Sequence, residues 1–509
     1  IGKIKKMYPK LQEKSDVIYK EYKVENKIST YEQLIENISR LRNKEKIDDV
    51  WYYIYQYYKS QSDFEQGING AYALLRDLYS GSNGAWAMGE LRSDNTTYVY
   101  NPTDRGTISA EFVKDFLDDA NNSVPYHKYV TNYSIISNVN YLLEPIDGVD
   151  FDESVKNNIK GQAYFLRALA YFDLVQYFGS VPLHLTPVKT MEETALPLSE
   201  VDAVYEQIIK DAKLAIELLP DKSKQELGRA TSGAARTLLG NVYIVRKNWS
   251  EAEKVLKEVT GYDLWNNYED AFEPANKNGI ESIFEVQFKE GNEGYASNFF
   301  YVFLPQPITA EEVSAITGIK ENSYIVEGYN IPTPDIIAAY EQGDERKDAS
   351  IGWLTASGNP YPYIKKYCHA HALTNNTNDN WPVYRYSEVL LFLAEALNEQ
   401  DKTDEALPYL NKVRNRVGLD DSQATGKEAV RKAILQERRV ELAFENKRWL
   451  DLTRSGEVET VMKAYGERVK SNPSAYYFPA GYSVAPNSYT DIRILFPLPA
   501  SEAALSPYF

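Results

Sequence analysis

The feature that most constrains the fold is the pattern of a helix pair, two consecutive α-helices joined by a short turn, which recurs in two distant parts of the chain. In residues 233–259 and again in residues 390–413, small and apolar residues recur at helical spacing on both sides of a short polar break. Two copies in one register indicate a repeat, and their small residues allow two helix backbones to approach closely. The matching positions are Leu239, Gly240, Tyr243, Ala252, Leu256 and Val259 in one copy, and Leu393, Ala394, Leu397, Ala406, Leu410 and Val413 in the other.

The spacing is typical of tetratricopeptide (TPR) repeats, in which a helix pair recurs about every 34 residues. Other helical patterns precede and follow the two copies. The sequence therefore predicts a mainly α fold with TPR-type helix pairs over about 109–262 and 381–456. We expect a leucine in place of Gly240 to overpack its helix pair.

Between these two stretches, residues 264–380 lose the helical period. Short strand-like runs alternate there with turns rich in Asn and Gly, and the stretch is too long to be one connection. We therefore expect a large irregular subdomain of loops and short strands, inserted into the repeat array. Residues 1–58 are lysine-rich with a helical pattern and have no assigned role, so we treat 59–509 as the main domain.

Composition excludes some classes of function. The formal net charge of −17 over 509 residues argues against nucleic acid, whose phosphates need a basic face. No apolar run approaches the roughly 20 residues that a membrane-spanning helix needs. The 41 tyrosines combine an apolar ring with a hydroxyl, which suits flat polar ligands such as sugars as well as protein interfaces.

Two loop-like segments, 85–106 and 291–307, mix aromatic side chains with amides and charged groups. Such loops are credible binding surfaces, although the first can equally be a packed loop that caps the helices. Our hypothesis places these segments at one shallow site where sugars stack on rings and bond to polar groups. The predicted ligand-binding residues are Trp86, Arg92, Asp94, Asn95, Tyr98, Tyr100, Tyr295 and Tyr301.

Two other clusters resemble chemical sites. Cys368, His369 and His371 are metal-ligand types, but an extended segment points Cys368 away from the two histidines, so we predict no metal and no cofactor. The second cluster lies on one helical stretch where each acid has an arginine within a turn, which favours a structural ion-pair network over acid–base catalysis. Its members are Glu437, Arg438, Arg439, Glu441, Arg448 and Asp451.

Several motifs in one order carry a family resemblance over roughly residues 60–507. They are GELRSDN, GQAYFLRALAYFDLVQYFGSVPL, RATSGAARTLLGNVYI, RYSEVLLFLAEALNE, LNKVRNRVGL, ERRVELAFENKRWLDLTRSG and LFPLPASE. Together they closely resemble the SusD/RagB family of outer-membrane glycan-binding lipoproteins.

The resemblance implies a surface-exposed protein at the outer membrane, held by an N-terminal lipid anchor whose cysteine this sequence does not include. It also implies a SusC-like TonB-dependent barrel transporter as partner and a non-enzymatic role: binding oligosaccharides or polysaccharide and delivering them to that transporter. The alternatives are a peptide-binding import lid, a TPR scaffold for other proteins, and a glycosidase, which would need two carboxylates across a cleft.

Overall fold

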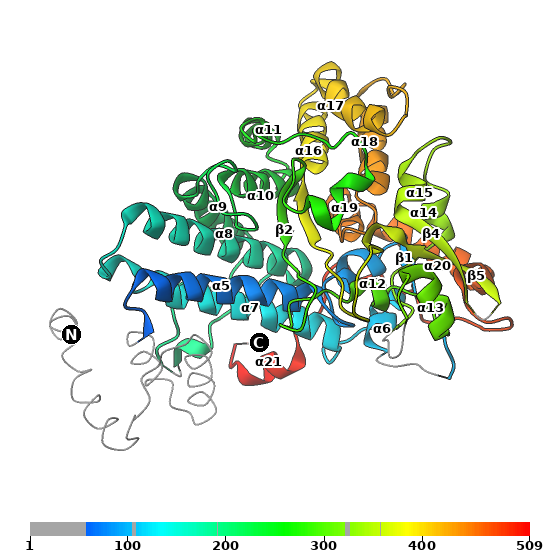
Figure 1. The fold of residues 1–509 in the computed structure, drawn as a ribbon, viewed down its shortest axis with the longest axis horizontal. Coiled ribbons are helices and arrows are strands. Elements are labelled where there is room, and N and C mark those ends of the chain that lie inside the picture. Colours follow the sequence, from blue (N-terminus) through cyan, green and yellow to red (C-terminus); the bar gives the residue numbers. More distant parts are fainter. Residues whose placement is uncertain (1–56, 104–107, 191, 321–325, 357, 509) are drawn as a thin grey trace.

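The computed structural model describes residues 57–103, 108–190, 192–320, 326–356 and 358–508 (Figure 1). Residues 1–56, for which the sequence predicts helix, lie outside the described residues. Stacked helices form one side of the molecule, and short helices, strands and long loops form the other (Figure 1). The mainly α fold with TPR-type helix pairs is confirmed.

The helices of the stack pack on their neighbours in chain order, from α5 to α18. They are α5 Gln61–Tyr79, α7 Ser123–Leu143, α8 Glu153–Phe178, α9 Val201–Leu218, α10 Ser232–Val245, α11 Trp249–Lys257, α16 Tyr386–Glu399, α17 Thr403–Arg416 and α18 Lys427–Glu441. The remaining α-helices are shorter or lie outside the stack. They are α6 Ser109–Asp115, α12 Phe299–Val302, α13 Ala310–Thr317, α14 Pro334–Ile337, α15 Arg346–Ser350, α19 Arg448–Ser455, α20 Val458–Ser471 and α21 Ala500–Leu505.

The small residues of the repeat lie where the paired helices meet. Ala394 of α16 and Ala406 of α17 are both fully buried. At Gly240 of α10, a Cβ atom would lie 2.4 Å from Cδ2 of Leu256 on α11, well inside van der Waals contact. Glycine at this position therefore lets the two helices pack closely, because a larger residue would force the side chain of Leu256 to shift.

The irregular region interrupts a stack that is continuous in space, because α11 packs directly on α16 although more than a hundred residues separate them. The strands of the described residues form three antiparallel two-stranded sheets, β1–β3, β2–β6 and β4–β5, in which β1 comes from the segment after α5 and the others lie in or next to the irregular region. The strands are β1 Thr96–Thr97, β2 Ser282–Val286, β3 Ile331–Pro332, β4 Ile351–Ala356, β5 Asn359–Ile364 and β6 Trp381–Arg385. The pair β2–β6 brings the two ends of the inserted region together beside the helix stack, where β2 contacts α5 and α10 and β6 contacts α16.

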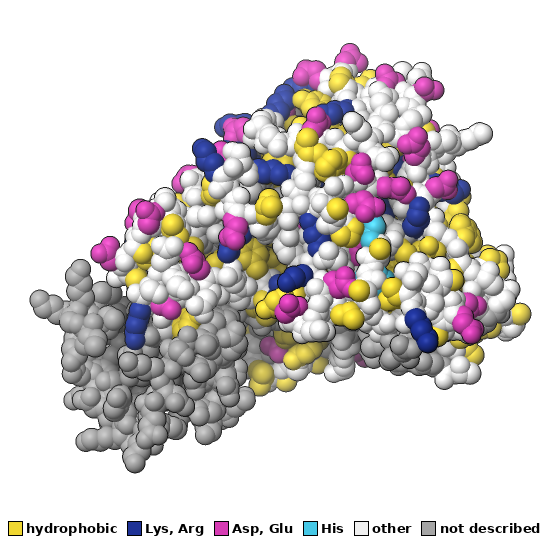
Figure 2. Space-filling view, in the orientation of Figure 1, with side chains coloured by type: hydrophobic (Ala, Val, Ile, Leu, Met, Phe, Trp, Pro, Cys, Tyr) yellow, Lys and Arg dark blue, Asp and Glu magenta, His cyan; other side chains and the backbone are white. Residues whose placement is uncertain are grey.

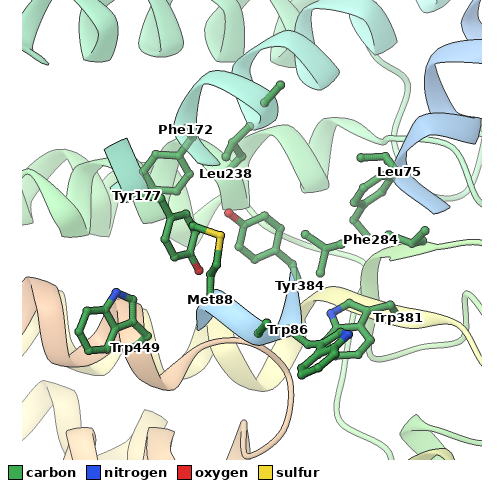
Figure 3. Close-up of a cluster of buried hydrophobic side chains, with 14 of the residues drawn as sticks. Leu75, Trp86, Met88, Phe172, Tyr177, Leu238, Phe284, Trp381, Tyr384 and Trp449 are labelled. Atoms are coloured by element: carbon green, nitrogen blue, oxygen red, sulfur yellow. The ribbon is translucent and has the colours of Figure 1, made fainter. Parts of the chain in front are cut away.

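One hydrophobic core extends through the helices and the irregular region. Figure 3 shows part of it, where Phe172 and Leu238 from the helix stack lie near Tyr384 and Trp86 from the strands and loops. This shared core makes the two parts a single folded body. Among the residues that the structure describes, no helix combines the length and apolar character needed to cross a bilayer.

Candidate functional site

The segment that begins at residue 85 does not form the predicted surface site. The indole of Trp86 is 0% exposed and packs against Phe303 and Tyr329, with ring centroids 5.1 and 5.8 Å away. Its Nε1 donates a hydrogen bond of 3.0 Å to the carbonyl of Gly81. A ring with every face covered cannot stack on a sugar, so the prediction for Trp86 is wrong.

Asp94 and Asn95 are also buried, and they join this segment to α18 and α19. The Asp94 carboxylate accepts from Arg448 Nε at 2.8 Å and lies 2.8 Å from Arg439 NH2, while Arg439 Nε donates to Asn95 Oδ1 at 2.9 Å. Burial raises the pKa of Asp94, but the two guanidinium groups outweigh it and hold the pKa well below the ordinary value. The two residues therefore have a structural role.

Three more predicted ligand-binding residues are buried with internal partners. The prediction of a surface role is wrong for them too, because their polar atoms are directed into the protein and not toward solvent. Arg92 NH1 donates to Asp118 at 2.7 Å, the Tyr98 hydroxyl donates to Asp115 at 2.9 Å, and the Tyr301 hydroxyl lies 2.6 Å from His371 Nε2.

The two remaining predicted residues reach the surface at different places. Tyr100 is half-buried, with its ring centroid 4.4 Å from that of Tyr482. Tyr295 is 46% exposed, and its ring lies against the guanidinium of Arg76, with the Arg76 Cζ 4.8 Å from the ring centroid. For these two tyrosines, ligand binding stays a prediction.

The histidines near Cys368 are engaged by protein groups. His369 Nδ1 bonds to the carboxylate of Asp379, and His371 Nδ1 lies 2.8 Å from the carbonyl of His369. Burial lowers the pKa of His369, but the Asp379 hydrogen bond and charge raise it above the ordinary value. Within the described ranges, no group of three or more His, Cys, Asp or Glu side chains is arranged to hold a metal ion.

The predicted ion-pair network on α18 is confirmed. Glu437 pairs with Arg346 at 2.6 Å and with Arg414 at 3.0 Å. Arg438 pairs with Asp451 of α19 at 2.9 Å. Two further residues extend the network toward the irregular region. Glu441 contacts Arg346, Arg385 and Arg416. Arg385 in turn contacts Glu281 and Glu445. The buried charges thus fasten the insertion to the end of the repeat array.

An open groove of about 600 Å³ lies where α5, the loop 226–229 and the end of β2 meet. Its size falls within the range of small-molecule sites, about 300–1,000 Å³. One wall is a stripe along α5 that carries Gln66, Asn69, Ala73 and Arg76 at helical spacing, on the side of the helix opposite the buried residues.

The opposite wall is the loop 226–229, in which the side chain of Leu227 is 75% exposed. The hydroxyl of Tyr72 on α5 accepts a 3.0 Å bond from the backbone N–H of Ala230 and so fixes the loop beside the helix. Gly228 has φ of +84°, and a Cβ there would lie 2.8 Å from Cγ of Gln287. Glycine therefore both permits the turn and lets the loop approach the floor.

The floor of the groove comes from the end of β2, where Glu285 and Gln287 join an amide network. Gln287 exchanges hydrogen bonds with Asn278 at 2.9 and 3.0 Å, and Asn380 donates to Glu285 at 2.8 Å. The network fixes these side chains, and Tyr295 also lines the groove. The floor is therefore rigid, and an aromatic ring above it can bind a polar ligand with apolar faces by ring contact, while the exposed amides of Gln66 and Asn69 on α5 can supply hydrogen bonds.

Of this groove, the sequence singled out Tyr295 alone. The α5 stripe had a sequence signal, since polar residues recur there at helical spacing, but nothing in the sequence marks it as a wall of a site. The loop 226–229 and Gln287 come together only through the folding of distant segments. On the face shown in Figure 2, basic and acidic side chains are interspersed, without one large basic area.

Comparison with protein families gives two matches that cover different parts of the chain. The model of the SusD family matches residues 348–508, and the model "starch-binding associating with outer membrane" matches residues 49–244. A third model, the fifth domain of the ATP-dependent helicase/deoxyribonuclease AddB, matches residues 21–69, most of which lie outside the described residues.

Individual relatives agree with the first two models. A SusD-like protein P2 from Formosa agariphila is 27% identical over 493 residues, covering 88% of this chain and 91% of the relative. A laminarin-binding SusD-like protein has a TM-score of 0.71 at 25% identity, with 88% of this chain and 98% of that chain covered.

A SusD homologue from Bacteroides thetaiotaomicron has a similar fold, with a TM-score of 0.74 at 21% identity over 89% of this chain and 97% of that one. The TPR-type stack, the inserted region and the family models all lead to the same conclusion. The chain is a SusD-like member of the SusD/RagB family.

Proposed function

We propose that this protein binds glycans in the groove between α5, the loop 226–229 and β2, without catalysis. The observation that carries the proposal is the exposed ring of Tyr295 in a groove whose α5 wall carries the exposed amide side chains of Gln66 and Asn69. Sugars have apolar C–H faces that pack on such rings, and hydroxyls that bond to amides. The similarity to a laminarin-binding SusD-like protein supports a carbohydrate ligand.

The carboxylates of the groove support a binding role and not a hydrolytic one. Glu226 pairs with Arg229, and Glu285 accepts bonds from Asn380 and from the backbone N–H of Asn278. A glycosidase needs one carboxyl free to give a proton and another free to attack or to activate water. Incubation with oligosaccharides should therefore release no new reducing ends.

The experiment that tests binding is calorimetry with a panel of oligosaccharides and two tyrosine variants. Tyr295→Ala should weaken binding about tenfold or more, because stacking on an aromatic ring is worth roughly 1–3 kcal/mol in related systems. Tyr126→Ala is the matched control, since Tyr126 is 40% exposed and lies on α7 outside the groove. Equal affinities for Tyr295→Ala and the unmodified protein would place the site elsewhere.

We also propose a setting, which the family resemblance supports: the protein is held at the cell surface of the outer membrane by an N-terminal lipid anchor and delivers its ligand to a SusC-like TonB-dependent transporter. The helix stack supports this, because stacked helix pairs offer a broad rigid face to another protein. A permanent complex of this kind should bury more than about 2,000 Å².

Purification from outer membranes in mild detergent tests the partner. We expect a barrel-sized companion to co-purify with the protein, and deletion of the gene to reduce glycan uptake. A protein that runs alone, and whose deletion leaves uptake unchanged, would contradict the delivery role while leaving glycan binding to be judged by calorimetry.

A further inference from the structure

We infer that the groove selects anionic glycans, with Arg76 binding a carboxylate or sulfate group of a sugar that packs near Tyr295. The inference rests on the proposed function, because it assigns a ligand class to the same groove. It starts from a difference between Arg76 and the other arginines of the molecule.

Every other arginine among the described residues forms an ion pair with a carboxylate, whether it lies in the core or on the surface. Even Arg236 and Arg246, on the outside of the stack, pair with Glu258 and Asp202. Within the same described ranges, Arg76 has no carboxylate partner, and its guanidinium contacts the Tyr295 ring instead.

Arg76 is also partly removed from water. Its side chain is half-buried in the wall of the groove, and burial lowers its pKa, with only Tyr295 among the described residues acting in the opposite direction. The two acids of the groove do not compensate it, because Glu226 and Glu285 are held by Arg229 and by the Asn278–Asn380 network. A partly desolvated charge without a counterion is costly, and binding an anion removes that cost.

The chemistry of the guanidinium defines the anion. Its planar set of donors matches two oxygens of a carboxylate or of a sulfate ester, and such charge-assisted pairs are about twice as strong as neutral hydrogen bonds. Arg76 and Tyr295 line the groove together and touch one another. A single sugar unit can therefore contact the ring with its C–H face and the guanidinium with an acidic substituent.

The net charge of the molecule makes this arginine more important. At −17, the protein as a whole repels a polyanionic glycan. Recognition of such a ligand then requires a fixed local cation that is not neutralised by a neighbouring acid, and in the groove Arg76 meets that condition.

The test compares three oligosaccharide probes of matched length: a neutral glucan from laminarin, a uronate oligomer from polygalacturonate and a sulfated oligomer from carrageenan. Calorimetry is run on the unmodified protein and on Arg76→Gln, Arg76→Lys and the control Arg236→Gln. We expect at least one anionic probe to bind tenfold or more tighter than the neutral probe. Arg76→Gln should abolish that preference, Arg76→Lys should restore part of it, and Arg236→Gln should leave it unchanged.

The uronate and sulfate arms identify which acidic group is recognised. Equal or weaker binding of both anionic probes relative to the neutral glucan would overturn the inference, as would a preference that survives in Arg76→Gln. In either case, a neutral glucan that loses affinity in Tyr295→Ala would leave the proposed function standing. If none of the probes binds, and a broad glycan panel gives no ligand, both proposals are wrong.

Discussion

Residues 85–100 and residues 291–298 look alike in the sequence and differ in the structure. They belong to the two loop-like segments 85–106 and 291–307. Each places aromatic side chains, in 291–298 the ring of Tyr295 alone, among amides or charged groups without a helical period. The first segment is almost entirely buried, with Asp94 held by arginines of α18 and α19, whereas the second carries the exposed ring of Tyr295. The comparison teaches that the composition of a loop does not decide its exposure, because partners from distant elements do.

The largest effect is expected from Trp86→Ala. Removing a fully buried indole from the core should lower the free energy of unfolding by about 3–5 kcal/mol, measured by chemical denaturation. Trp265→Ala is the control, because Trp265 lies nearer the surface, outside the buried core. A Trp86→Ala protein of unchanged stability would mean that the first segment is not part of the core and would break the comparison.

Asp94→Asn should destabilise the protein by about 3 kcal/mol, because it keeps the shape of the side chain but leaves Arg439 and Arg448 without their shared countercharge. The matched control is Asp202→Asn, whose carboxylate is 76% exposed in its pair with Arg246 and should matter by less than about 1 kcal/mol. Similar losses in the two variants would show that the ion pairs at Asp94 do not hold this segment.

Lys114 of α6 lies against the same segment, because its amine donates a hydrogen bond to the carbonyl of Ser93. We expect this contact to make the stability of the protein depend on pH. Burial lowers the pKa of Lys114 to about 7, although Asp94 and Asp115 act to raise it. Between pH 7 and 10.5, the ordinary pKa of a lysine, Lys114 is therefore protonated in the unfolded chain and mostly neutral in the folded protein. The free energy of unfolding rises with pH in that window.

Relative to Lys114→Met, the unmodified protein should gain about 2 kcal/mol of stability between pH 7 and pH 9. Denaturation curves for both proteins at several pH values measure the difference. Curves that stay parallel across this range would contradict the burial of a titrating lysine against the segment.

The smallest effect is expected from Tyr295→Ala on stability. An exposed ring in the second segment should change the free energy of unfolding by no more than about 0.5 kcal/mol, even though glycan affinity falls. Thermal melting of the variant used for calorimetry provides the value. A loss as large as that of Trp86→Ala would remove the distinction between the two segments.

The repeat helices could be predicted from the sequence because their signal is local. Gly240 and Ala394 stand at fixed offsets from the residues they touch, so one periodic pattern contains both partners of each contact. The α18 network was predictable only as a cluster of charges on one helix. The acids Glu437 and Glu441 pair with arginines of other segments, such as Arg346, and the sequence did not indicate those partners.

Of the residues that line the candidate groove, the sequence singled out Tyr295 alone, and its role in binding stays a prediction. Trp86 and Asp94 were misassigned because their partners, Phe303 and Arg448, are hundreds of residues away along the chain, and no local pattern shows that a loop will be covered. The wall formed by residues 226–229 depends on Gly228 approaching Gln287, which is likewise a contact between distant segments.

The pairing of β2 with β6 has a consequence for how this protein can diversify. Near the start of the inserted region, β2 hydrogen-bonds with β6, the strand on which the chain returns to the helix stack, so this pair holds the two ends of the region together. Once this strand pair has formed, lengthening the loops between β2 and β6 adds little entropic cost, about 0.6 kcal/mol for each doubling of loop length. The loops between β2 and β6 can therefore change in length and sequence while the helix stack keeps its packing.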